Sequence, residues 1–186
     1  SGKIEITGAL GDVMQESAKI AVSYVRSIAD LYDIPHNFYK NRDIHIHAPQ
    51  GAVPKDGPSA GVTMVTALVS ALTERPVRGE VSMTGEIDLH GNVLPIGGLK
   101  EKSMAAYKNG CTTVLIPKRN LPDLEEVDQE VKDHLRFVPV ETISQVLETA
   151  LVKPAAQPPE EVEELPSAPP RKKAEPARPR DTHIKQ

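Results

Sequence analysis

Ser59 is the side chain in this sequence that is best placed to act as a nucleophile. It lies in the segment GPSAG at 57–61, directly before an apolar run from Val62 to Leu72. Asp56 is a residue type that caps helices, and Pro58 suits a first helical turn because its missing N–H would be unpaired there. This order predicts that Ser59 sits in the first turn of a buried helix, where free N–H groups favour a developing oxyanion. An ordinary helix start has the same residue types, so the segment alone does not establish catalysis.

The same segment matches G-x-S-x-G, the nucleophile elbow of α/β-hydrolases. An elbow requires a strand that runs straight into the serine. The preceding residues, APQGAVPKD, contain two prolines and a glycine, which make a poor central strand. Only His90 and His134 follow the serine within the region expected to fold. An esterase-type hydrolase is therefore the weaker alternative, and it predicts that His134→Ala abolishes activity.

Two histidines upstream of the serine are further candidates for a base. His45 and His47 alternate with isoleucines in DIHIHA at 43–48, so they share one face of an expected strand. With Asp43 or Asp56 they would complete a Ser-His-Asp triad. They could equally form half of a metal site, but the sequence offers no obvious third ligand. Solvent-facing or structural histidines are the more common case.

The segment GGLKEKSMAA at 97–106 offers a lysine as an alternative base. Lys100 and Lys102 stand at the start of an expected helix, where a cation is unfavourable against the helix dipole. On a helical wheel both lysines have partly apolar neighbours, so periodicity does not choose between them. Whichever lysine turns inward is desolvated, and burial lowers a lysine pKa toward the range of a usable general base.

Hydrophobic periodicity and turn residues predict the elements that must position these side chains. The order β-α-β-α-β-β-α-β-α-β-α indicates an α/β or α+β domain with a mixed sheet and flanking helices. Strands are expected at 3–7, 43–48, 112–117 and 136–140, with two more around a turn at 90–92 inside 80–96. Helices are expected at 13–31, 62–72, 99–109 and 141–151, with two acidic helical stretches inside 122–134.

Composition predicts two parts, a folded domain at 1–152 and a disordered tail at 153–186. The tail is rich in proline and charge and has no aromatic residue, so it cannot bury enough apolar surface to offset its ordering entropy. It holds seven of the 22 Lys and Arg residues and six of the 26 Asp and Glu residues, which leaves 15 and 20 in the domain. That net charge of −5 argues against a domain built to grip nucleic acid.

The single cysteine, Cys111, fits a reducing compartment, because an internal disulfide needs two. The sequence has no signal peptide and no apolar run of membrane-spanning length. We therefore expect a cytoplasmic protein without a membrane partner.

Two long segments, PKDGPSAG and MTGEIDLHGNVLPIGGLKEK, resemble the proteolytic domain of bacterial-type Lon proteases. The resemblance runs almost continuously from about Gly8 to Leu151. It implies a Lon-type proteolytic fold, similar to domain 2 of ribosomal protein S5. It also implies a Ser-Lys dyad in which Ser59 is the nucleophile and Lys102 the general base, while Lys100 is a bystander. Thr84 matches a hydroxyl that orients the lysine, and Asp56 matches an acidic residue near the dyad.

The activity implied by this resemblance is serine endopeptidase cleavage of unfolded or damaged proteins through an acyl-enzyme. Backbone N–H groups of Ser59 and of a neighbour, Gly57 or Ala60, are candidates to hold the oxyanion. The extended segment at 51–55 is a candidate to pair with the substrate backbone.

Members of this family form hexameric rings and carry an AAA+ ATPase module on the same chain. This sequence has no G-x-x-x-x-G-K-[ST] motif, so no cofactor is expected here, and ATP and Mg²⁺ are expected only for the ATPase module. The family pattern also includes residues before KIEIT, so the N-terminal edge of the domain is expected to be truncated. A catalytically silent ring-assembly module is a third alternative; the presence of both Ser59 and Lys102 argues against it. The resemblance places the protein in stress response and protein quality control.

Overall fold

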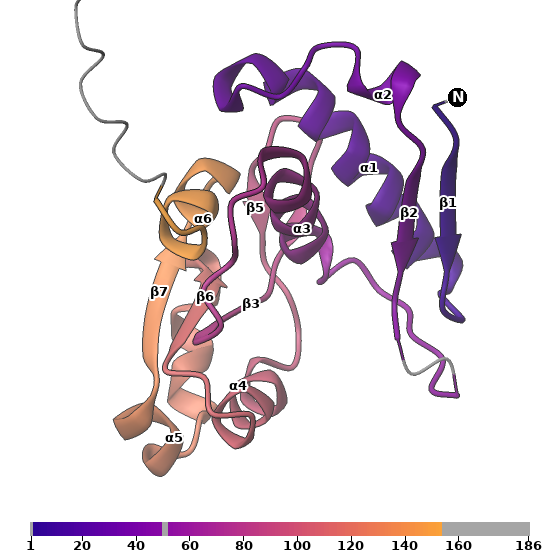
Figure 1. Cartoon of the computed structure of the whole chain (residues 1–186). Helices are drawn as coiled ribbons and strands as arrows, with labels where there is room; N and C mark the ends of the chain where they lie inside the picture. The colour runs from indigo at the N-terminus through magenta and orange to yellow at the C-terminus, as the bar shows by residue number, and fades with distance from the viewer. Residues whose placement is uncertain (1, 50–51, 154–186) are drawn as a thin grey trace, which may run out of the picture. The chain divides into compact units, whose positions relative to one another are not determined.

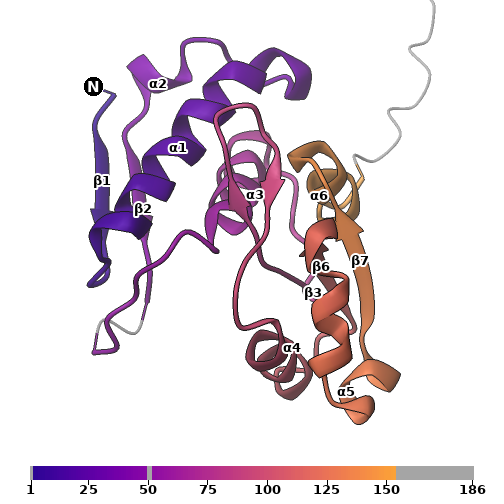
Figure 2. The same ribbon diagram turned by 180° about the vertical axis from the view of Figure 1, so that it is seen from behind.

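The computed structural model describes residues 2–49 and 52–153, whose strands form three small sheets (Figures 1 and 2). Two are parallel and one is an antiparallel hairpin, so the predicted combination of helices and strands is confirmed. Parallel and antiparallel strands lie in separate sheets, however, and not in one mixed sheet as expected. The sheets are β1 (Ile4–Thr7) with β2 (Ile44–His47); β3 (Val81–Met83), β6 (Thr113–Pro117) and β7 (Arg136–Val140) in the order β3-β6-β7; and β4 (Glu86–Ile87) with β5 (Val93–Leu94).

The predicted helices occur in the predicted order, with differences at their ends, and one further short helix, at 38–41, was not predicted. The first predicted helix ends three residues early and continues as a 3₁₀ turn, and the acidic stretch before 134 divides into a 3₁₀ turn and a short α-helix. The helices are α1 (Asp12–Ile28), α2 (Phe38–Asn41), α3 (Gly61–Thr73), α4 (Leu99–Lys108), α5 (Gln129–His134) and α6 (Ile143–Ala150). The 3₁₀ turns are η1 (Ala29–Tyr32), η2 (Lys118–Asn120) and η3 (Pro122–Glu126).

The buried apolar side chains form two clusters. In the first, α3 packs against α1 and α6, with Val25, Val65 and Leu147 among its fully buried members. The second lies among α4, α5, β6 and η3, with Val131 among its members. β6 contributes to both clusters because its residues alternate between faces, with Leu115 in the first cluster and Ile116 in the second.

The start of α1 is capped by a side chain from a distant segment. The Met14 N–H donates to Oδ1 of Asp56 at 3.1 Å, which satisfies one of the unpaired donors of the first turn. Asp56 was expected to cap the helix that follows it, and that expectation is wrong. That helix, α3, begins only at Gly61, and Asp56 is too far before it to reach its first turn.

The turn between β4 and β5 is held by the carboxylate of Asp88. The N–H groups of His90 and Asn92 each donate to its Oδ1 at 2.9 Å, and the Asn92 side chain donates to Oδ2 at 2.7 Å. Burial acts to raise the pKa of Asp88, but these hydrogen bonds outweigh it and hold the pKa below its ordinary value. The turn is closed by the Gly91 N–H, which donates to the Asp88 carbonyl at 3.1 Å, so it spans residues 88–91 and begins two residues before the predicted position, 90–92.

No helix within 2–49 and 52–153 is long and apolar enough to cross a membrane. The predicted disordered tail lies, apart from Lys153, outside the described residues.

Candidate active site

Ser59 lies in a tight turn immediately before α3. The Gly61 N–H donates to the carbonyl of Pro58 at 3.1 Å, which closes the turn around the serine. Since α3 begins at Gly61, Ser59 precedes the helix by two residues and is not in its first turn, as the sequence had suggested. The Ser59 side chain therefore projects from a turn and not from a helix.

The turn is fixed by a reciprocal pair of hydrogen bonds to Gly85. The Gly85 N–H donates to the carbonyl of Ser59 at 2.9 Å, and the Val62 N–H donates to the carbonyl of Gly85 at 3.1 Å. A Cβ at Gly85 would lie 2.8 Å from Cγ1 of Val62 and 2.8 Å from Cγ1 of Val93, so only glycine fits this close approach. The hydroxyl of Thr84 adds a longer bond to the Ser59 carbonyl at 3.4 Å.

Lys102 projects from the first turns of α4. It is half-buried, and its Nζ donates to the carbonyl of Gly97 at 2.7 Å. Gly98, the N-cap residue before α4, has a left-handed backbone with φ of 69°, a conformation that glycine adopts without strain. Lys100 is exposed instead, and its Nζ forms an ion pair with Oδ1 of Asp128 at 3.2 Å. The two lysines therefore have different surroundings, which the helical wheel did not distinguish.

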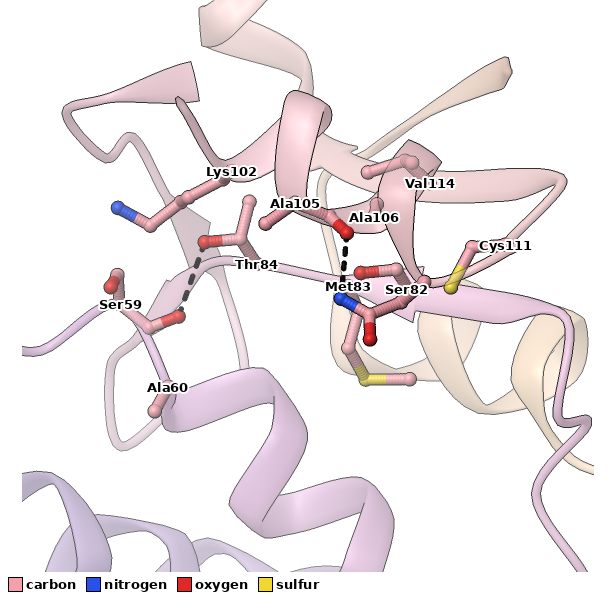
Figure 3. Close-up of a pocket in the computed structure, with 11 residues that line it drawn as sticks. Ser59, Ala60, Ser82, Met83, Thr84, Lys102, Ala105, Ala106, Cys111 and Val114 are labelled. Atoms are coloured by element: carbon pink, nitrogen blue, oxygen red, sulfur yellow. Dashed lines mark hydrogen bonds between the residues drawn. The ribbon is translucent and has the colours of Figure 1, made fainter. Parts of the chain in front are cut away.

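Ser59, Thr84 and Lys102 line one cavity of about 370 Å³, and Figure 3 shows their side chains on the same side of it. The cavity lies between the start of α3, the strand β3 and one face of α4. Lys102 is the charged residue among the described residues that line the cavity. The walls away from Lys102 and Ser59 are mainly apolar. The remaining lining residues are Ala60, Ser82, Met83, Ala105, Ala106, Asn109, Cys111 and Val114.

The three backbone donors suggested for the oxyanion differ in their bonding. The Gly57 N–H already donates to Oδ1 of Asp56 at 2.8 Å. Within the described part of the chain, the N–H groups of Ser59 and Ala60 donate to no acceptor. Both residues also line the cavity, so they are the better candidates.

Asp56 does not line the cavity. Its carboxylate binds the N–H groups of Met14 and Gly57, and a Cβ at Gly11 would overlap it. Asp56 thus connects the serine turn to the start of α1, and its contact with the site is through the backbone.

No strand leads into Ser59: residues 57–60 form bends and turns. This excludes the strand–turn–helix geometry of a hydrolase elbow. His134 lies on α5, where Nδ1 is 2.7 Å from the Glu130 carbonyl and the ring is 5.1 Å from that of Tyr107. Neither His134 nor His90 is among the described residues that line the cavity.

His45 and His47 share the exposed face of β2, as predicted. Their ring nitrogens Nε2 and Nδ1 lie 2.9 Å and 2.8 Å from the hydroxyl of Thr7. Both line a different cavity, between β2 and α3. No cluster of three potential metal ligands occurs among residues 2–49 and 52–153.

Two features of this site were missed in the sequence. The Gly97 carbonyl that accepts a hydrogen bond from Lys102 is a backbone group, so its role cannot be recognised from a side chain in the sequence. Gly85 was read only as part of the strand segment at 80–96. The signal that could have found both is the placement of glycines beside the candidate side chains, in MTGE and GGLKEK.

The family model of the Lon protease (S16) C-terminal proteolytic domain matches residues 1–153. The chain belongs to this family. The resemblance drawn from PKDGPSAG and MTGEIDLHGNVLPIGGLKEK is thereby confirmed, and the chain is placed among peptidases.

Curated Lon proteases match over most of the chain. The Lon protease of Heliobacterium modesticaldum is 58% identical over 168 residues, which cover 90% of this chain and 21% of that protein. The Lon protease of Clostridioides difficile is 59% identical over 152 residues, covering 82% of this chain and 19% of that protein. Lon protease 1 of Myxococcus xanthus is 59% identical over 151 residues, which cover 81% of this chain and 18% of that protein. The chain thus spans about a fifth of the length of these relatives.

Proposed function

We propose that this chain is a serine endopeptidase domain in which Ser59 is the nucleophile and Lys102 its general base. The observation that carries the proposal is the shared cavity. Ser59 precedes α3 and Lys102 lies on α4, yet both line the same pocket, while Lys100, two residues away, pairs with Asp128 outside it. Membership of a proteolytic-domain family supports the reaction class.

In the proposed reaction, the neutral amine of Lys102 accepts the proton of the Ser59 hydroxyl as its oxygen attacks the substrate carbonyl. Collapse of the tetrahedral intermediate breaks the peptide bond, and Lys102 returns the proton to the departing amine. Water then attacks the resulting ester with Lys102 again as base, and Ser59 is regenerated. The bond from Nζ to the Gly97 carbonyl would hold the amine while its lone pair faces the serine.

The remaining predicted site residues have positioning roles in this proposal. The N–H groups of Ser59 and Ala60 would stabilise the oxyanion, because they are the donors left without an acceptor among the described residues. The Thr84 hydroxyl would hold the Ser59 backbone by donating to the Ser59 carbonyl, and it would also orient Lys102. Asp56 would act on the serine turn from the α1 side.

For the whole protein, we propose ATP-dependent cleavage of unfolded or damaged polypeptides in the cytoplasm, as part of stress response and protein quality control. The peptidase domain would be residues 1–152, with a fold like that of domain 2 of ribosomal protein S5, followed by a disordered tail at 153–186. A homohexameric ring and an AAA+ module that uses ATP and Mg²⁺ would supply unfolded substrate. That the relatives are about five times longer is compatible with such a module.

The dyad is tested by hydrolysis of a fluorogenic peptide, measured across pH for the parent chain and three variants. Ser59→Ala and Lys102→Met should each reduce turnover by at least about a thousandfold, because they remove the nucleophile or its base. Lys100→Met is the matched control: it removes the same charge from the same helix and should keep turnover within about twofold.

If Lys100→Met is the damaging change, the base has been assigned to the wrong lysine. If the parent chain neither hydrolyses peptide nor reacts at Ser59 with a small fluorophosphonate, the peptidase proposal fails for this chain and the ring-assembly alternative gains support.

A further inference from the structure

A buried hydroxyl on α1 lies against the turn that carries Ser59. Ser17 is only 4% exposed and belongs to the buried face of α1, the helix that packs against α3. A Cβ built at Gly61, the first residue of α3, would lie 3.2 Å from Oγ of Ser17. Burial of a hydroxyl costs free energy unless it forms a hydrogen bond, so the partner of this one is informative.

The Ser17 hydroxyl forms its hydrogen bond outside its own helix. It donates to the carbonyl of Pro58 in a long bond of 3.5 Å. The buried hydroxyls of Thr66 and Ser103 instead donate to the carbonyl four residues earlier in their own helices, at 2.8 Å and 2.7 Å, which is a common bond for such residues. Ser17 therefore connects α1 to the residue before the proposed nucleophile, although it is not among the described residues that line the cavity.

The Pro58 carbonyl and the Ser59 N–H belong to one peptide unit. The peptide bonds of the described residues are trans, and a trans peptide is planar, so its C=O and N–H point in opposite directions. Two donors hold this carbonyl, the Gly61 N–H at 3.1 Å and the Ser17 hydroxyl. By holding the carbonyl they also fix the direction of the Ser59 N–H, which donates to no acceptor among the described residues.

The next peptide unit is held in the same way. The Ser59 carbonyl accepts from the Gly85 N–H at 2.9 Å and from the Thr84 hydroxyl at 3.4 Å (Figure 3). This carbonyl shares its peptide plane with the Ala60 N–H, the second candidate to bind the oxyanion. Each candidate N–H is thus directed by one backbone N–H and one hydroxyl, which act on the carbonyl of the same peptide unit. Hydrogen bonds accepted by a carbonyl also polarise its amide, which makes the N–H a stronger donor.

We propose that Ser17 is a positioning residue for oxyanion stabilisation: its hydroxyl holds the Pro58 carbonyl and thereby directs the Ser59 N–H toward the cavity. Ser17 touches neither the substrate nor the reacting atoms and acts through Pro58. Thr84 has the equivalent role for the Ala60 N–H. The inference rests on the proposed function, because an oxyanion forms only when Ser59 attacks a carbonyl.

The first test compares Ser17→Ala with Ser103→Ala in the hydrolysis of a fluorogenic peptide across pH. Both variants lose a buried helical hydroxyl, but that of Ser103 bonds within α4 and serves as the matched control. Loss of an oxyanion donor costs about 10²–10³ in kcat; Ser17→Ala keeps the donor and loosens its direction, so kcat should fall about tenfold while KM stays within about twofold. Ser103→Ala should keep kcat within about twofold.

Two further readouts separate positioning of the oxyanion donor from other effects. The pH midpoint of kcat/KM should be the same in Ser17→Ala and the parent chain, because the base, Lys102, is not affected. Ser17→Cys fills the space of the serine and offers a weak S–H donor, so its kcat should lie between those of Ser17→Ala and the parent.

The second test observes the N–H directly and needs no catalysis. Residual dipolar couplings measured by NMR report the orientation of each backbone N–H bond, and they are compared among the parent, Ser17→Ala and Ser103→Ala. The Ser59 coupling should change in Ser17→Ala and stay at the parent value in Ser103→Ala. Couplings along α1 and α3 should match the parent in both variants, which shows that the fold is retained.

An unchanged Ser59 coupling in Ser17→Ala, or a kcat within twofold of that of an active parent, would overturn the inference and leave the peptidase proposal in place. A loss of kcat with a shifted pH midpoint would also overturn it, because the effect would then lie on Lys102. If the parent hydrolyses nothing but its Ser59 coupling still depends on Ser17, the peptidase proposal fails alone and the control of the N–H direction by Ser17 is supported.

Discussion

The difference between Lys100 and Lys102 illustrates how much two residues matter on a helix. They point about 200° apart around α4, since each residue advances by 100°. The Lys102 Nζ therefore reaches the Gly97 carbonyl, and the Lys100 Nζ reaches Asp128. The Lys100–Asp128 pair is about half exposed on both sides, so it contributes little to stability. Lys100 is therefore a suitable control position for the Lys102 substitution.

Thr84 allows the role of a single hydroxyl to be separated from stability. We expect Thr84→Val to change the free energy of unfolding by less than about 1.5 kcal/mol, because the Ser59 carbonyl keeps its bond from the Gly85 N–H. Turnover of a fluorogenic peptide should fall about tenfold or more if the hydroxyl positions the dyad. Urea unfolding and peptide hydrolysis measured on the same preparation check both. Full activity in Thr84→Val would remove this residue from the proposed site, and Thr84→Ser should restore activity otherwise.

Among the elements, the turn that carries Ser59 is notable because partners on both sides hold it. Asp56 ties it to α1, and Gly85 ties it to the segment after β3. Neither contact is local in sequence, so the position of the serine depends on tertiary structure and not on the propensity of its own segment. α4 contributes the lysine and is held separately, in the second apolar cluster.

Removing the cap that Asp56 provides should weaken α1 and loosen this turn together. We expect Asp56→Ala to lower the free energy of unfolding by about 1 kcal/mol, the usual cost of a lost cap, and Asp56→Asn to lower it by less, because an amide oxygen still accepts from Met14. Peptide turnover should fall in the same order. Chemical denaturation checks the first expectation, and equal stabilities of the parent and Asp56→Ala would show that the contact is not a cap.

The sequence predicted most of the helices and strands, but it did not predict how the strands pair into sheets. Alternation in KIEIT and DIHIHA identified two strands correctly, and the apolar run at 62–72 identified α3. It could not show that the strands divide into three sheets, because alternation reports which face is buried and not which strand lies alongside. Helical periodicity could not choose between the lysines for a related reason: both have apolar neighbours on the helix, and the packing of α4 distinguishes their surroundings.

For the domain as a whole, β6 is the strand on which both apolar clusters depend. Leu115 and Ile116 are fully buried neighbours that face opposite clusters. A packing defect on either face therefore acts on the same three-stranded sheet, and we expect residues 2–153 to unfold as one unit.

Two single substitutions test this dependence. Leu115→Ala and Ile116→Ala should each lower the free energy of unfolding by about 2–5 kcal/mol, and each should keep a single transition. Denaturation followed by far-ultraviolet circular dichroism and by exchange of protected amides checks this. Two separate transitions in either variant would mean that the clusters fold independently.

The bonds between Ser59, Val62 and Gly85 also bear on when the chain acquires its chemistry during synthesis. The serine leaves the ribosome before the segment that holds its backbone, and the lysine follows later still. A nascent chain therefore carries no organised nucleophile until the chain between them has closed on itself. In the proposed dyad, peptide cleavage therefore begins only after the chain has been synthesised beyond Lys102 and has folded.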